Sequence, residues 1–161
     1  MRRNQYHIGT YSNAIDRMLR VSRLADYASV VMACLARHPG EVLPAAQVGA
    51  ETHLEAPTVS KLLKRLAQAG LVDSFRGATG GYRLARSAKD ISLAEIVEAL
   101  DGPIGLTECS LGHAGCERQS FCAVSRDWQG IGATIDNALR GVSLADMLHR
   151  RAGGARGARA P

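Results

Sequence analysis

The sequence predicts a mainly α-helical protein with one small β-hairpin. Aromatic residues make up only 4% of the 161-residue chain, whereas the hydrophobic set as a whole reaches 46%. A core built from Ala, Leu, Val and Ile favours helices and argues against disorder. Apolar residues recur at helical spacing in several segments, and two short strand-like runs flank a glycine-rich turn. The length suits one domain with an appendage.

The first predicted helix follows a start without an apolar pattern. Residues 1–17 are interpreted as a disordered extension or an upstream start assignment, and Met18 as the opening of the domain. They contain no secretory signal, and no apolar run in the chain approaches the ~20 residues of a membrane span. The helix is predicted from apolar residues at helical spacing, which are Val21, Leu24, Ala28, Val31 and Leu35. Pro39 and Gly40 stop it. Cys34, one residue from this stripe, is expected to be a small buried hydrophobe.

Two further helices and the hairpin follow in the order of a winged helix-turn-helix. A short helix is predicted over about residues 44–51, because proline is tolerated at a first helical position. A second helix begins at Pro57 and ends at Gly70. Its apolar residues are spaced i, i+3, i+4, i+7, and they are Val59, Leu62, Leu63 and Leu66. Residues 71–76 and 82–86 are predicted strands on either side of the glycine-rich turn.

The C-terminal part is predicted to contain a capped helix, a long loop and a dimerisation helix. Ser92 and Glu95 match a capping box, which starts a helix. Residues 101–125 form a loop with three cysteines, and loops of that length are usually functional or disordered. The region 126–149 presents an apolar stripe and is expected to form a long dimerisation helix; the stripe consists of Trp128, Ile131, Ile135 and Leu139. The arginine-rich tail, 150–161, is expected to be disordered.

The net charge of +5 is concentrated in one segment. Residues 57–86 hold six basic side chains against one acid, whereas residues 91–149 hold three against eight. A basic block inside a patterned segment points to a polyanion such as nucleic acid. A helix suits the major groove when one face packs on its own domain and the other offers donors, and the helix over 57–69 meets both conditions. Residues 18–100 are therefore predicted to bind duplex DNA, although a solvated charged face fits the same pattern.

The candidate DNA contacts fall on the basic helix and on the wing. They are Thr58, Ser60, Lys61, Lys64, Arg65, Arg76, Gly80 and Gly81. The first three lie at the helix start, from which base-edge contacts normally come, and the next two would reach phosphates one turn further on. Arg76, at the base of the wing, could enter a narrow minor groove. The wing glycines would let the backbone approach a phosphate chain closely.

Three cysteines in the long loop are candidate metal ligands. Cys109, Cys116 and Cys122 are spaced C-x6-C-x5-C, without the tight pair usual in zinc sites and ferredoxins. In a cytoplasmic protein, metal binding or redox sensing is a more common use of cysteine than a structural disulfide. Three thiolates from one loop can wrap a compact iron–sulphur cluster. The candidates for a fourth ligand are His113, Glu117 and Asp26. Three free thiols or a thiol–disulfide sensor are the alternative.

Wing and cysteines together make the chain similar to the Rrf2 family of bacterial regulators, which includes the iron–sulphur regulators IscR and NsrR. The resemblance runs from Met18 to about Leu148. The matching stretches are Leu19–Tyr27, Thr58–Leu66, Gly70–Val72, Arg76–Tyr82, the three cysteines and Trp128. The first stretch most resembles the branch that regulates the SUF iron–sulphur assembly operon. The resemblance implies a homodimeric winged-helix repressor or activator whose DNA affinity responds to a cluster held by the three cysteines. It also supports Met18 as the natural beginning.

Two departures from the family pattern concern the cluster ligands. The first cysteine gap is one residue longer than in IscR-like members. Those members also use a histidine three residues after the last cysteine, where this chain has Ser125. NsrR-like members use an aspartate of the partner subunit near the start of the first helix, which makes Asp26 the first choice here and His113 the second. The resemblance favours a 2Fe–2S cluster, and 4Fe–4S is possible.

The sequence thus predicts a cytoplasmic, cluster-sensing transcriptional regulator of iron–sulphur assembly genes. Its expected partners are double-stranded operator DNA and a second copy of itself, with no membrane and no small-molecule substrate. One alternative is a thiol-redox or nitric-oxide-responsive repressor without a stable cluster, and another is an iron–sulphur electron carrier or cluster-delivery protein. An enzyme is not expected, because no Ser/His/Asp order, phosphate loop or paired-carboxylate pattern stands out.

Overall fold

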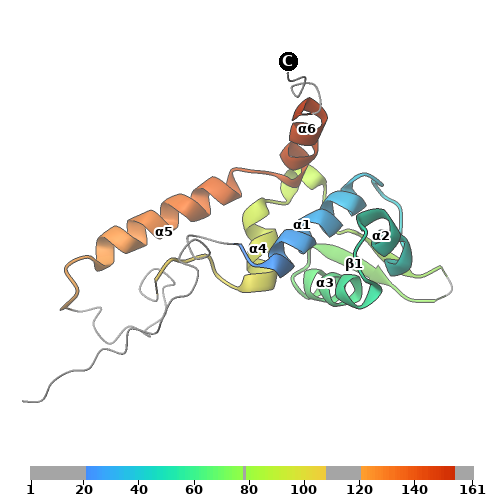
Figure 1. Cartoon of the computed structure of the whole chain (residues 1–161), viewed down its shortest axis with the longest axis horizontal. Coiled ribbons are helices and arrows are strands. Elements are labelled where there is room, and N and C mark those ends of the chain that lie inside the picture. The colour runs from blue at the N-terminus through green and yellow to red at the C-terminus, as the bar shows by residue number, and fades with distance from the viewer. Residues whose placement is uncertain (1–20, 78, 108–120, 155–161) are drawn as a thin grey trace, which may run out of the picture.

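The computed structural model describes residues 21–77, 79–107 and 121–154, with the side chains of the last five left aside. The helices and strands, shown in Figure 1, are α1 (Arg23–Ala36), α2 (Ala45–Thr52), α3 (Ala56–Gln68), β1 (Val72–Phe75), β2 (Gly81–Leu84), the 3-10 turn η1 (Ala88–Asp90), α4 (Leu93–Asp101), α5 (Ser125–Arg140) and α6 (Leu144–Gly154). The predicted fold class is therefore confirmed: the chain is mainly helical with one small hairpin. The extension 1–17 and the cysteines at 109 and 116 lie outside the described residues.

The helices α1 to α4 and the hairpin form a head around one hydrophobic core. All four apolar residues predicted to line α3 are completely buried, and α4 contributes Ile96, Val97 and Leu100 to the same core. α1 packs against α2, α3 and α4. Cys34 is 0% exposed, as predicted for a small buried hydrophobe. The head is therefore one packed unit in which α3 presents its polar face outward.

The start of α1 differs from the prediction. The hydroxyl of Ser22 accepts a hydrogen bond from the Ala25 amide at 3.0 Å and caps the helix, so Val21 precedes it and is 49% exposed. The prediction that Val21 belongs to this helix was wrong, because the N-cap at Ser22 fixes the helix start after it. The amide of Ser22 also donates to the Asp101 carboxylate at 3.2 Å, which ties the start of α1 to the end of α4.

The wing is joined to the segment before α2. β1 and β2 pair antiparallel, with Ser74 opposite Tyr82. Tyr82 also forms an isolated bridge to Leu43, and both amide–carbonyl hydrogen bonds of this bridge measure 2.9 Å. Gly81 is buried at this crossing. β2 is thus paired on both sides, with β1 and with the chain that leads into α2.

The predicted single helical region over 126–149 is two helices. α5 ends at Arg140, and Gly141 follows as its C-cap. The hydroxyl of Ser143 accepts the amide of Asp146 at 3.1 Å, while the Asp146 carboxylate accepts the amide of Ser143 at 3.0 Å. This reciprocal cap starts α6, which continues to Gly154. The disordered tail predicted from residue 150 was wrong for 150–154, because the cap at Ser143 starts a helix that runs through them.

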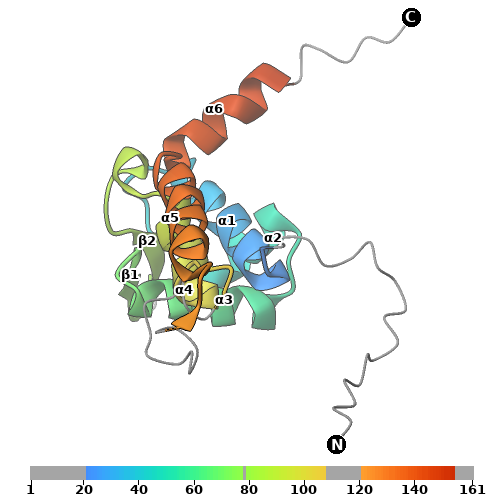
Figure 2. The same ribbon diagram turned by 90° about the vertical axis from the view of Figure 1, so that its left-hand side faces the viewer.

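α5 and α6 extend away from the head. In Figure 1, α5 projects from the side of α4, while α6 leaves the head separately and also stands apart in Figure 2. Leu144, the first residue of α6, is completely buried and anchors it to the core. No helix of the described part of the chain is long and apolar enough to cross a membrane.

Candidate nucleic-acid interface and cysteine segment

The helix-turn-helix unit consists of α2, a three-residue turn and α3. His53 ends α2 in the left-handed conformation, with φ of 55°, and the amide of Leu54 donates to the Gly49 carbonyl at 3.2 Å. A Cβ on Gly49 would lie 3.2 Å from the Leu54 carbonyl oxygen, so glycine lets the turn close tightly. Pro57 lies in the first turn of α3, where a missing amide hydrogen costs nothing.

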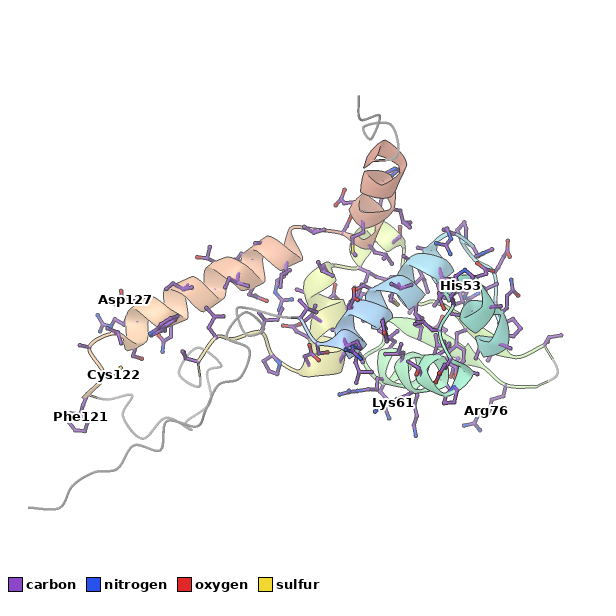
Figure 3. The ribbon with its side chains drawn as sticks, in the orientation of Figure 1. His53, Lys61, Arg76, Phe121, Cys122 and Asp127 are labelled. Carbon is purple, nitrogen blue, oxygen red and sulfur yellow. The ribbon has the colours of Figure 1, made fainter. Side chains whose placement is uncertain are left out.

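The basic residues of the predicted interface divide into two groups. The side chains of Lys61, Lys64 and Arg76 are exposed, and none forms an ion pair with another described residue. Figure 3 shows Lys61 and Arg76 along the same edge of the head, one from α3 and one from the end of β1. This edge therefore offers unneutralised positive charge from two different elements.

The other two arginines of the wing are engaged within the protein. The guanidinium group of Arg83 pairs with Asp73 at 3.3 Å and stacks over the Phe75 ring at 4.8 Å from its centroid. Arg86 pairs with Glu95 at 2.8 Å. Part of the basic charge found by sequence analysis thus supports the hairpin and α4, and the free part belongs to the α3–wing edge. On α3, Ser60 is exposed and Thr58 and Arg65 are partly buried.

The wing glycines are required by packing inside the chain. A Cβ on Gly81 would lie 2.4 Å from the Leu43 carbonyl oxygen, and one on Gly80 would lie 2.6 Å from that of Phe75. Gly77 has φ of +107°, a conformation that favours glycine. Gly81 is buried, so the structure does not support the predicted DNA contact of its backbone. Gly80 is partly exposed and stays a prediction.

A carboxylate braces α1 against α2 behind the helix-turn-helix. Glu51 accepts hydrogen bonds from Gln47 at 3.1 Å and from Cys34 at 3.4 Å, and it contacts Nε2 of His38 at 3.0 Å. Arg37 lies 3.7 Å away. The hydrogen bonds from Gln47, His38 and Cys34 lower the pKa of Glu51 from its ordinary 4.5 to about 2. The ionised form is therefore the one that the fold stabilises.

We expect Glu51→Gln to lower stability at neutral pH and to have a smaller effect at pH 3. Because the folded-state pKa is depressed, the Glu51 carboxylate stabilises the fold above about pH 4.5, and this contribution is lost as the pH falls toward 2. Urea midpoints at pH 7 and pH 3 measure the difference. Glu41→Gln is the matched control, since that carboxylate is 65% exposed and contacts His38 at 3.6 Å. Equal midpoints for Glu51→Gln and the parent at pH 7 would refute the brace.

Cys122 lies at the outer end of α5. Figure 3 shows it beside the start of that helix, remote from α1, with Asp127 at the same end. Asp26 is exposed in the first turn of α1 and lines a cavity of about 740 Å³ with Arg23, Tyr27 and residues of α4 and α6. The structure does not bring Asp26 and Cys122 of one chain together. Among the described residues, no three His, Cys, Asp or Glu side chains form a metal-binding group. Cys109, Cys116 and His113 lie outside them.

A helix-turn-helix beside a hairpin wing, with unpaired basic side chains on one edge, defines the class of winged-helix DNA-binding regulators. The chain belongs to the Rrf2 family, described as iron-dependent transcriptional regulators, whose model matches residues 21–150. It is thus a transcriptional regulator and not an enzyme, and the family predicted from the sequence is confirmed.

Relatives and solved structures agree with this assignment. The chain is 29% identical over 134 residues to the HTH-type transcriptional regulator IscR of Photorhabdus laumondii, covering 83% of this chain and 81% of that protein. IscR of Xenorhabdus nematophila is 30% identical over 81% of this chain and 79% of its own length. The structure of T. potens IscR is 31% identical, with a TM-score of 0.64 over 88% and 94% of the two chains. CymR, the global cysteine regulator of B. subtilis, is 27% identical, with a TM-score of 0.65 over 83% and 98%.

Several features of the site were missed by sequence reasoning. Ser143 and Asp146 match the capping-box spacing that predicted α4, and the same signal could have predicted α6. Asp127 is an acid near the last cysteine that was passed over. The pairs Leu43–Tyr82 and Glu51–Cys34 join distant parts of the chain, and no local pattern indicates them.

Proposed function

We propose that this protein is an iron–sulphur cluster-sensing transcriptional regulator, acting in the cytoplasm on iron–sulphur assembly genes of the SUF type. One observation carries the proposal: an unpaired basic edge on α3 and the wing occurs in the same chain as three cysteines that end next to α5. The similarity to IscR proteins supports it. DNA affinity is coupled to the state of the cluster, and repression is the regulation expected for this family.

Duplex DNA is the proposed partner of the α3–wing edge. Ser60 and Lys61 are exposed near the start of α3 and would read base edges in the major groove. Thr58 is partly buried and would contribute through its hydroxyl. Lys64 and Arg65 lie one turn further on and bind phosphates. Arg76 reaches the adjacent minor groove from the end of β1.

A second copy of the chain is the proposed partner of α5. Trp128 and Ile131 are 39% and 45% exposed, although both are large and apolar. Ile135 and Leu139 continue the stripe toward the head and are partly buried. A helix face of this kind gains free energy when a second copy covers it. Two paired α5 helices would present two heads to half-sites about one helical turn apart.

The donor set fits a 2Fe–2S cluster, with 4Fe–4S as the alternative. Cys109, Cys116 and Cys122 supply soft thiolates, and the bound cluster would link the loop to whatever group provides the fourth ligand. The Asp26 carboxylate forms no hydrogen bond or ion pair with another described residue, so it is available as an oxygen ligand. Because Cys122 lies far from α1 of its own chain, Asp26 would act across the dimer.

A thiol-redox or nitric-oxide-responsive repressor is the second candidate, and the similarity to CymR favours it. Cys34 cannot be its sensor. The thiol is 0% exposed, and burial together with the hydrogen bond to Glu51 raises its pKa to about 11. A thiolate is the reactive form of cysteine, so the burial and the raised pKa of Cys34 both disfavour its reaction. Either sensor must therefore use the cysteines of the loop.

Anaerobic purification with iron and sulphide analysis distinguishes these candidates. We expect the parent protein and Cys34→Ala to carry iron, acid-labile sulphide and visible absorption, and we expect Cys122→Ala to lose all three. Cys34→Ala is the matched control, since it removes a thiol that cannot reach a metal. A colourless parent protein without iron would reject the cluster and leave the thiol sensor. A brown parent that binds no duplex DNA in either cluster state would indicate an electron carrier or cluster-delivery protein instead.

The same measurement on three further variants identifies the fourth ligand. Asp26→Ala should weaken cluster retention if the carboxylate acts across the dimer. His113→Ala tests the second choice. Asp127→Ala tests the acid that lies at the same end of α5 as Cys122. If one variant loses the cluster and the other two retain it, the residue replaced in that variant is the fourth ligand.

A further inference from the structure

Two polar attachments close to its C-terminal end join α5 to the head, where α5 also packs against α4 and buries Gly132. Directly after the helix, the backbone is pinned to the start of α4. The amide of Leu93 donates to the Val142 carbonyl, and the amide of Leu144 donates to the Ile91 carbonyl, both at 2.8 Å. These bonds fix the point at which α5 joins the head. By themselves these bonds do not set its direction, because a single hinge point allows a helix to tilt.

An arginine provides the second attachment. The Nη2 atom of Arg140 lies 2.5 Å from the Glu98 carboxylate on α4, and its Nε atom lies 2.8 Å from the Asp136 carboxylate on α5 itself. One guanidinium group therefore spans the two helices. Asp136 orients the guanidinium group from within α5, and Glu98 receives it on the head. Glu98 lies further along α4 than the backbone hinge, so the two attachments together define a direction.

The ion pair between Arg140 and Glu98 is suited to adjusting the angle of α5 and less suited to fixing it permanently. The side chains of Arg140 and Glu98 are 44% and 31% exposed, and exposed ion pairs contribute little to stability. The second oxygen of Asp136, Oδ1, is buried and has no hydrogen-bond partner within the described residues. A buried carboxylate oxygen without a partner is unfavourable, which reduces the net stabilisation that this arrangement provides.

α4 connects α5 to the recognition helix, because it packs against both. Ile96, Val97 and Leu100 of α4 lie in the same core as the buried face of α3, and α4 packs against α3. α5 has 16 residues and is about 24 Å long, so a tilt of ~10° moves its outer end by about 4 Å. That displacement is close to the rise of one base pair, ~3.4 Å. A small change of tilt would therefore alter the half-site spacing that two paired heads can fit.

We infer that Arg140 is a positioning residue that sets the angle between α5 and the DNA-binding head by bridging Asp136 and Glu98, and thereby sets the half-site spacing. The inference rests on the proposed function, in that α5 pairs two heads on DNA. It assigns to Arg140 no contact with DNA and no role in holding a cluster.

Two measurements on the full chain test this role. The first is affinity for a duplex that the parent protein enriches from a random library, and for the same duplex with the spacer lengthened or shortened by one base pair. The second is small-angle X-ray scattering of the free protein, which reports the spread of head-to-head distances without DNA. The variants are Arg140→Gln, the charge exchange Arg140→Glu/Glu98→Arg, and Arg126→Gln as the control. Arg126 lies on the same helix and forms no ion pair with a described residue.

We expect the parent and Arg126→Gln to prefer one spacing by about tenfold, and Arg140→Gln to reduce this preference to under about threefold while widening the distance distribution. The charge exchange should restore both. Unchanged spacing preference and scattering in Arg140→Gln would overturn the inference. If the parent binds no DNA, the proposed function fails, whereas a widened distribution restored by the exchange still supports the bridge. An unchanged distribution in that case rejects the bridge too.

Discussion

The double variant Lys61→Ala/Arg76→Ala is expected to bind duplex DNA about 100-fold more weakly than the parent at moderate salt. Both side chains are exposed, neither is neutralised by a described acid, and they come from α3 and the wing. Without these two contacts, protein binding also releases fewer counterions from the DNA. The slope of log K against log salt concentration should therefore fall by about two. Fluorescence anisotropy at several salt concentrations measures both quantities.

A double variant with the same net charge serves as the control. Lys89→Ala/Arg126→Ala removes two exposed positive charges from η1 and α5, outside the α3–wing edge. It should bind within about threefold of the parent, since long-range electrostatics are largely screened at physiological salt. Equal losses in the two double variants would mean that DNA senses the net charge and not this edge. Binding by Lys61→Ala/Arg76→Ala at parental strength would reject the interface.

Gly81→Ala is expected to destabilise the head by about 2–3 kcal/mol and to weaken DNA binding at least tenfold. The new Cβ would lie 2.4 Å from the Leu43 carbonyl oxygen and 2.6 Å from its carbonyl carbon, and both are backbone atoms that cannot rotate away. To make room, the wing must move and lose the hydrogen bonds between Leu43 and Tyr82. Arg76 would then leave its place beside α3.

Urea unfolding and DNA titration of Gly81→Ala test this account. Gly130→Ala is the matched control, because a Cβ there meets nothing within 4 Å and the residue lies inside α5. Alanine is the better helix former by up to about 1 kcal/mol, so Gly130→Ala should be as stable as the parent or slightly more stable. If Gly81→Ala retained parental stability, the packing of the wing against Leu43 would not matter as the structure indicates.

Local patterns predicted the elements of the head because those elements depend on local rules. The spacing of Val59, Leu62, Leu63 and Leu66 predicted both α3 and its buried face, and all four are completely buried. The capping box at Ser92 predicted the start of α4. The burial of Cys34 followed from its place beside an apolar stripe. These features need only residues within a few positions of one another.

The features that position the site depend on residues far apart in the chain. Leu43 and Tyr82 pair across the wing, and Arg140 reaches Glu98 over 42 residues. No periodicity encodes such contacts, because they arise only when the elements pack. Sequence patterns likewise do not indicate which basic residues are free and which are engaged in ion pairs. Only the structure shows the pairs Arg83–Asp73 and Arg86–Glu95.

Only part of the basic charge behind the net +5 is therefore available to bind a polyanion. Charges on α3 and at Arg76 are free for a polyanion, whereas those of Arg83 and Arg86 hold the wing and α4 in place. The α3–wing edge is thus fixed by contacts that themselves use basic residues. The account predicts that DNA affinity is lost both by removing the free charges and by displacing the wing.

Coupling between the cysteine segment and DNA is the central claim. The most direct test is the affinity of one anaerobic preparation for a duplex enriched by the parent protein, measured with the cluster present and again after its removal by a chelator. The account predicts that the two dissociation constants differ by about 5- to 150-fold, the usual range of allosteric coupling, and that Cys122→Ala shows a single value near that of the cluster-free protein. Equal affinities with and without the cluster would contradict it.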